Sequence, residues 1–82
     1  MERAFFSKMN IGRQAHYTWR HGKHLAKVES PRFDYDLYRL HKFFVEIVYN
    51  IELGQVERIE GFSTTEKLMP YVENLDISEL IP

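Results

Sequence analysis

Cysteine is absent from the 82-residue chain, and its absence excludes a whole group of structures and chemistries. Disulfides, zinc–thiolate sites, thiol nucleophiles and iron–sulfur clusters all need a thiol. A domain this small buries only about 60 % of the surface that its unfolded chain exposes, so it usually needs an additional source of stability. Here that source has to be tight packing, a metal site of histidine and carboxylate, or self-association.

Long hydrophobic runs are also absent. The longest runs, such as 43–45, span a few residues, whereas a membrane-spanning helix needs about 20. The first residues lack the apolar stretch of a secretory signal. We therefore expect a cytoplasmic protein.

Apolar residues make up 44 % of the sequence and aromatic residues 15 %, which suits a packed core and not a disordered chain. We expect a single α+β domain over residues 15–82. Residues 1–14 form an arm or a short helix in this interpretation, because Ala4, Phe5 and Met9 fall near helical spacing and Gly12 interrupts the pattern.

The charge is uneven along the chain although the net charge is only −1. Residues 1–30 hold six Lys or Arg and two Glu, a balance of +4, and residues 31–82 hold five bases and ten acids, a balance of −5. Such polarity can steer a charged partner or orient a dimer. The alternative, which we favour, is that opposite charges meet across neighbouring strands and leave little net field.

Alternation of apolar and polar residues predicts an antiparallel five-stranded β-meander. The expected strands are 15–20, 23–29, 33–40, 44–50 and 55–62. His21-Gly22 is the expected hairpin turn between the first two strands. A turn closed by a glycine bulge at 51–54 sets Ile47 opposite Ile59 and Phe44 opposite Phe62.

One C-terminal helix is predicted to pack on one face of this sheet. Residues 63–66 (Ser-Thr-Thr-Glu) form a capping box, and Leu68, Val72 and Leu75 make one apolar stripe. Pro70 predicts a kink in this helix. Ile77, Leu80 and Ile81 are expected to close over the core. The covered face is expected to carry Leu37, Val45, Ile47, Tyr49 and Ile59.

The opposite sheet face is predicted to be apolar and uncovered, because a single helix shields only one face. Its expected residues are Tyr38, Leu40, Phe44, Val48 and Phe62, with Val56 beside them. A patch of this size is unusual on a monomer. It predicts a non-enzymatic protein-interaction module that forms a homodimer by stacking two such faces. Edge-strand pairing is another route, and the arm could instead cover the patch through Phe5, Phe6 and Met9.

Two segments, Tyr38–Tyr49 and Phe62–Leu80, resemble parts of short bacterial proteins of unknown function. The similarity covers roughly residues 16–81. It implies a small bacterial domain, and it transfers no catalytic or binding residue.

Nucleic-acid binding is the alternative function. In the expected hairpin 13–27, basic side chains alternate with an aromatic ring. Its candidate contacts are Arg13, Trp19, Arg20, Lys23 and Lys27. Such surfaces neutralise phosphates and stack bases in single-strand binders. Against this reading, Trp19 shares a predicted face with core residues, and the acidic second half would repel a nucleic-acid backbone.

No cofactor, metal site or catalytic activity is expected. His16, His21 and His24, with His41 as a possible fourth, are the candidate metal ligands, but the predicted register puts His16 and His24 on opposite faces and His21 in a turn. Asp34 and Asp36 are expected on one face near Glu46. We interpret them as solvent-exposed acids that aid solubility and not as a catalytic carboxylate pair. The sequence has no glycine-rich phosphate loop, nucleophile elbow or HExxH motif.

Overall fold

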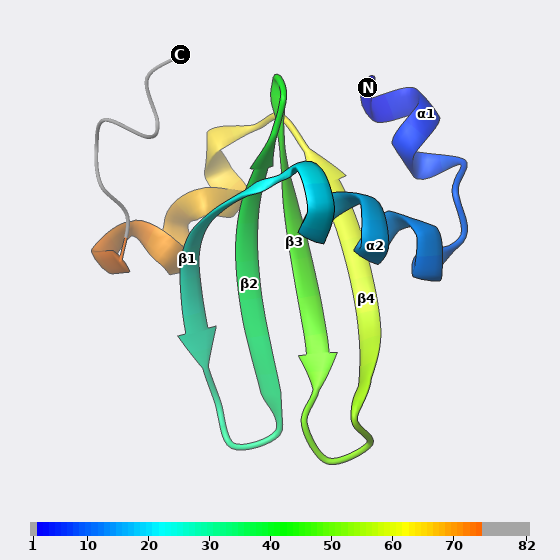
Figure 1. The fold of residues 1–82 in the computed structure, drawn as a ribbon. Helices are drawn as coiled ribbons and strands as arrows, with labels where there is room; N and C mark the ends of the chain where they lie inside the picture. Colours follow the sequence, from blue (N-terminus) through cyan, green and yellow to red (C-terminus); the bar gives the residue numbers. More distant parts are fainter. Residues whose placement is uncertain (1, 75–82) are drawn as a thin grey trace.

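The computed structural model describes residues 2–74 and contains a four-stranded antiparallel sheet in the order β1-β2-β3-β4 (Figure 1). Helices α1 (Arg3–Ser7) and α2 (Ile11–His21) precede the sheet. The strands are β1 (Lys23–Glu29), β2 (Phe33–Leu40), β3 (Phe43–Asn50) and β4 (Gln55–Phe62), and the 3-10 helix η1 (Thr65–Asn74) follows them. The fold is therefore α+β.

The β3–β4 hairpin has the predicted register. Ile47 pairs with Ile59, and Phe44 pairs with Phe62. The connecting turn depends on Gly54, which has a φ of 66° and whose N–H donates to the carbonyl of Asn50 at 2.8 Å. The Asn50 side chain accepts from the N–H of Leu53 at 2.9 Å and completes the turn. A positive φ at this position favours glycine because it has no Cβ.

The predicted first strand, 15–20, is wrong, because these residues belong to helix α2. The Asn10 side chain caps this helix by accepting from the N–H of Arg13 at 2.9 Å. Ala15 and Thr18, three residues apart, are 3 % and 0 % exposed and form its inner side. The alternation of Ala15, Tyr17 and Trp19 is a strand pattern, whereas the helix buries Ala15 and Thr18, so the Asn10 cap is the sequence signal that indicates a helix.

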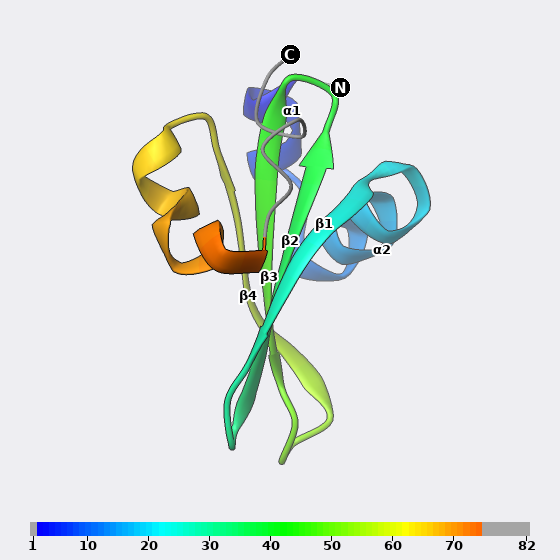
Figure 2. The ribbon, with the colours of Figure 1, turned by 90° about the vertical axis from the view of Figure 1, so that its left-hand side faces the viewer.

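Both faces of the sheet are covered, contrary to the expectation of one covered face (Figure 2). Helix α2 lies on one side and η1 lies on the other, while α1 lies beyond the β4 edge and inserts Phe6 into the cluster on the α2 side (Figures 1 and 2). The α-helical side buries Phe6 against Leu40, Phe43, Val45 and Ile47. The η1 side buries a second cluster, which contains Ala26, Leu37, Phe62, Leu68 and Tyr71.

The C-terminal helix packs on the face opposite to the expected one. Leu68 and Tyr71 contact the cluster with Leu37 and Phe62, whereas Val45 and Ile47 face the α-helices. The reason for the split is the β2–β3 register, which pairs Tyr38 with Val45 and Leu37 with Glu46. Leu37 therefore lies on the other side from Val45.

Helix η1 differs from the predicted helix in its period. In a 3-10 helix the side chains three residues apart are aligned, so Leu68 and Tyr71 face the sheet together. Val72, predicted to be buried, is 51 % exposed. Pro70 lies inside this helix. At an interior position of an α-helix, proline would remove one backbone hydrogen bond because it has no N–H. The expected contacts of Leu75, Ile77, Leu80 and Ile81 fall outside the described residues.

Two glycines of the N-terminal region provide a matched test of helix α2. A Cβ at Gly22 would lie 2.6 Å from the carbonyl oxygen of Thr18, whereas a Cβ at Gly12 would meet nothing closer than 3.5 Å. We expect Gly22→Ala to lower the free energy of unfolding by about 1–3 kcal/mol. Gly12→Ala should raise it by about 0.5 kcal/mol, because alanine is the better helix former. Urea unfolding measures both, and equal effects would contradict the end of α2 at Gly22.

Candidate functional site

The predicted interaction face does not exist as one surface. Tyr38 and Leu40 lie on the α-helical side of the sheet, whereas Phe44 and Phe62 lie on the η1 side. Val48 pairs with Tyr35 and shares the η1 side by strand alternation. Leu40, Val48 and Phe62 are buried within the chain itself. Val56 packs with the α-helical cluster, not with Phe44.

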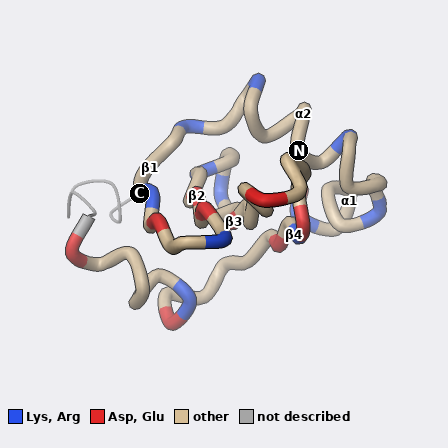
Figure 3. The backbone as a smooth tube through the Cα atoms, turned by 90° about the horizontal axis from the view of Figure 1, so that it is seen from below, with Lys and Arg blue, Asp and Glu red and all other residues tan. Residues whose placement is uncertain are grey.

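The outer side of α2 carries exposed bases. Arg13, His16 and Arg20, spaced by three and four residues, are exposed on the helix side away from Ala15 and Thr18. Within residues 2–74, neither Arg13 nor Arg20 forms an ion pair. The chain has no Asp or Glu between Glu2 and Glu29, so α2 itself carries no acid (Figure 3).

Trp19 stands beside this basic stripe and is 54 % exposed. Its indole N–H is close enough to the Tyr38 oxygen on β2 to influence the pKa of that hydroxyl. An indole N–H can only donate, so the Tyr38 oxygen is the acceptor. Burial and the nearby Asp36 carboxylate raise the pKa of Tyr38, and the Trp19 N–H opposes that rise. Much of the ring surface faces solvent.

The bases of β1 meet acids on β2, as the favoured interpretation of the charge pattern expected. His24 Nε2 lies 2.8 Å from Asp36 Oδ1, and Lys27 Nζ lies 3.7 Å from Asp34 Oδ2. Lys27 is therefore less available to a partner than the α2 arginines. Lys23 is exposed at the start of β1. The predicted hairpin 13–27 is in fact a helix followed by a strand.

The histidines and carboxylates are distributed over separate places. His41 Nε2 lies 3.4 Å from the Tyr17 hydroxyl, while His24 contacts Asp36. Glu46 is on the η1 side, so the expectation that it shares a face with Asp34 and Asp36 is wrong. No group of three or more His, Asp or Glu side chains that could hold a metal occurs among residues 2–74.

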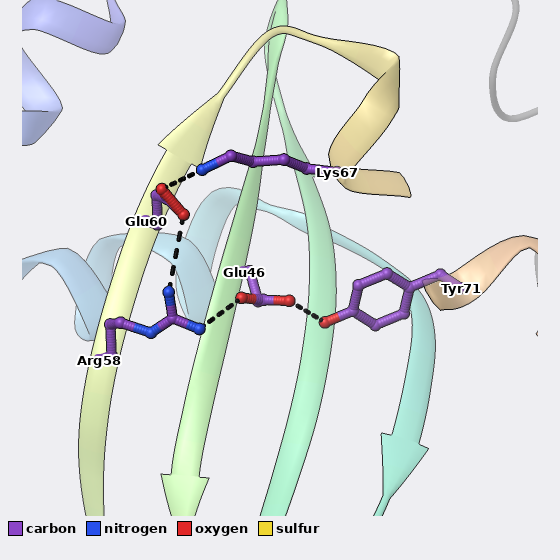
Figure 4. A network of polar contacts seen from close by, with 5 residues as sticks. All are labelled: Glu46, Arg58, Glu60, Lys67 and Tyr71. Carbon is purple, nitrogen blue, oxygen red and sulfur yellow. Dashed lines mark hydrogen bonds and ion pairs between the residues drawn. The ribbon is translucent and has the colours of Figure 1, made fainter. Parts of the chain in front are cut away.

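A polar network on the η1 side fastens that helix to the sheet (Figure 4). The Tyr71 hydroxyl donates to Glu46 Oε2 at 2.7 Å, and Arg58 Nη2 donates to Glu46 Oε1 at 3.1 Å. Arg58 Nη1 also lies 3.8 Å from Glu60 Oε1, and Lys67 on η1 forms an ion pair with Glu60. Burial, followed by the hydrogen bond to Glu46, raises the pKa of Tyr71 well above its usual range.

A signal for this network is present in the sequence of the two facing strands. The β3–β4 register places Glu46 directly opposite Glu60. Like charges opposite each other destabilise a sheet, so cations are needed beside them. Arg58 and Lys67 provide those cations. The role of Tyr71 could not be predicted from an α-helical period, which points residue 72 toward the sheet instead.

Comparison with family models, with curated proteins and with solved structures finds no match to this chain. The resemblance to short bacterial proteins therefore stays a prediction. Among the described residues, no helix has the length and apolar character needed to cross a membrane.

Replacing Tyr71 by Phe tests the network through pH. Because the pKa of Tyr71 is higher in the folded chain, its contribution to stability is complete below about pH 10 and declines as the pH rises further. The wild type should lose about 1.4 kcal/mol per pH unit more than Tyr71→Phe above pH 10. At pH 7 the variant should be about 1.5–3 kcal/mol less stable. Chemical unfolding across this range measures both quantities, and parallel pH profiles would contradict the assignment.

Proposed function

We propose that the protein binds single-stranded nucleic acid through the outer side of α2. The observation that carries this proposal is an exposed tryptophan on an acid-free basic helix. Trp19 is 54 % exposed, and Arg13 and Arg20 lie on the same helix without an ion pair among residues 2–74. The proposal includes the cytoplasmic location expected from the sequence.

The chemistry of these groups suits a flexible strand. Each base has a π-face that can stack on an indole, and an arginine beside the ring can pair with the adjoining phosphate. His16 adds a further polar group on the same side of the helix.

The acids of the second half of the chain weaken this proposal less than the sequence suggested. Asp34 forms an ion pair with Lys27, and Asp36 is hydrogen-bonded to His24 on β1. Glu46 and Glu60 lie on the η1 side, across the sheet from α2. Much of the negative charge is therefore either paired locally or separated from α2 by the sheet.

Fluorescence provides a direct assay because the chain has one tryptophan. Titration with oligo(dT) at low salt should quench Trp19, and affinity should fall with a log–log salt slope of about −0.7 per neutralised phosphate. In anisotropy measurements with a labelled oligonucleotide, Trp19→Ala should weaken binding by about 1–3 kcal/mol. Arg20→Gln should weaken it and make the salt slope shallower.

Arg32→Gln is the matched control for Arg20→Gln. Arg32 lies between β1 and β2, is largely exposed and is 3.7 Å from Glu52. Its loss should leave affinity unchanged. Absence of quenching at low salt, or equal weakening by both arginine variants, would refute the proposal.

Self-association is the second candidate. Met69 and Val72 are 68 % and 51 % exposed on the outer side of η1, three residues apart, and form a small apolar stripe.

We expect light scattering of the wild type to give a dimer mass if η1 mediates pairing. The double variant Met69→Ser/Val72→Ser should then be monomeric with an unchanged circular dichroism spectrum. A monomeric wild type at all concentrations would refute this candidate.

A further inference from the structure

A cavity of about 460 Å³ lies where α1, the β2–β3 turn and the end of β4 meet. Figure 1 shows α1, this turn and the end of β4 at the same end of the molecule. The lining residues come from three separate parts of the chain, namely Glu2, Arg3, His41, Lys42, Phe43 and Ser63. The volume falls within the range of about 300–1,000 Å³ that is usual for small-molecule sites.

The polar lining is rich in groups that recognise phosphate. Arg3 offers a planar fork of N–H donors, Lys42 offers a compact charge, and Ser63 offers a hydroxyl. Neither Arg3 nor Lys42 forms an ion pair within the part of the chain that the structure describes. Glu2 is the one acid of the lining, so the two bases leave a net charge of +1 before any contribution from His41.

His41 is held in this cavity by an unusual backbone. Its φ is 59°, in the left-handed region, and it is the one non-glycine residue with a positive φ among those described. Among non-glycine residues, asparagine, aspartate and histidine adopt this conformation most often, so the turn accepts His41. The Tyr17 hydroxyl lies 3.4 Å from His41 Nε2 and restrains the ring from the α2 side. Residues in such conformations concentrate at ligand sites.

We propose that this cavity binds the phosphate group of a phosphate monoester. Arg3 and Lys42 neutralise the dianion, and the Ser63 hydroxyl and an imidazole N–H of His41 donate to its oxygens. Phe43, buried beneath the turn, provides the apolar wall. This site does not depend on the nucleic-acid proposal, because a small ester alone can fill it.

The test is a titration of the full chain with phenyl phosphate and with inorganic phosphate, followed by amide chemical shifts in two-dimensional NMR. Saturable shifts should occur at residues 2–3, 41–43 and 63. Lys42→Gln and Arg3→Gln should each weaken binding by about fivefold or more, and Glu2→Gln should strengthen it. His41→Asn, which tolerates the left-handed backbone, should weaken binding without unfolding the turn.

Lys8→Gln is the matched control, because Lys8 follows α1 but does not line the cavity. It should bind phenyl phosphate as the wild type does. No saturable shift at concentrations up to about 10 mM, or equal affinities of Lys42→Gln and Lys8→Gln, would overturn the proposal.

A second arm identifies the source of the phosphate. We compare a 5′-phosphorylated oligonucleotide with its 5′-hydroxyl form. If the phosphorylated form binds more tightly and Lys42→Gln abolishes the difference, the site binds the 5′-terminal phosphate of a nucleic-acid strand. Equal binding of the two forms, together with phenyl phosphate binding, would support it as a site for a free ester. Failure of both oligonucleotides with retained phenyl phosphate binding would refute only the proposed α2 interface.

Discussion

The structure depends on a sheet that is apolar on both faces. Val45 and Ile47 point to one side, and Leu37 and Phe62 point to the other. Neither side of so small a sheet can be left exposed without a large loss of hydrophobic stabilisation. The chain therefore covers one face with the segment before the sheet and the other with the segment after it (Figure 2).

This constraint explains the different chemistry of the two covers. The N-terminal cover contacts the sheet through small or uncharged side chains such as Phe6, Ala15 and Thr18, so its bases point outward. The C-terminal cover is fastened by charge: Lys67 and Tyr71 engage acids that the sheet itself presents. Consequently the arginines of α2 have no ion-pair partner among residues 2–74, while the charges beneath η1 neutralise one another.

Much of the sheet could be predicted from the sequence. The strands 23–29, 33–40 and 55–62 match β1, β2 and β4, and the β3–β4 register was correct because Gly54 and the turn length determine it. Helix α2 was missed because Ala15, Tyr17 and Trp19 alternate with the period of a strand. That error left one sheet face without a cover, and the predicted dimer surface followed from it. Of the five residues proposed for nucleic-acid contact, Arg13, Trp19 and Arg20 lie together on α2. The sequence pattern predicted a hairpin for them, and only the structure shows that they lie on a helix.

Nuclear Overhauser contacts of residues 6 and 15–20 measure the covering of the sheet most directly. We predict helical amide contacts through 15–20 and contacts between the rings of Phe6 and Phe43, whose centroids lie 5.6 Å apart. Cross-strand contacts between 15–20 and 23–29, with Phe6 free of the sheet, would contradict a sheet that is covered on both faces.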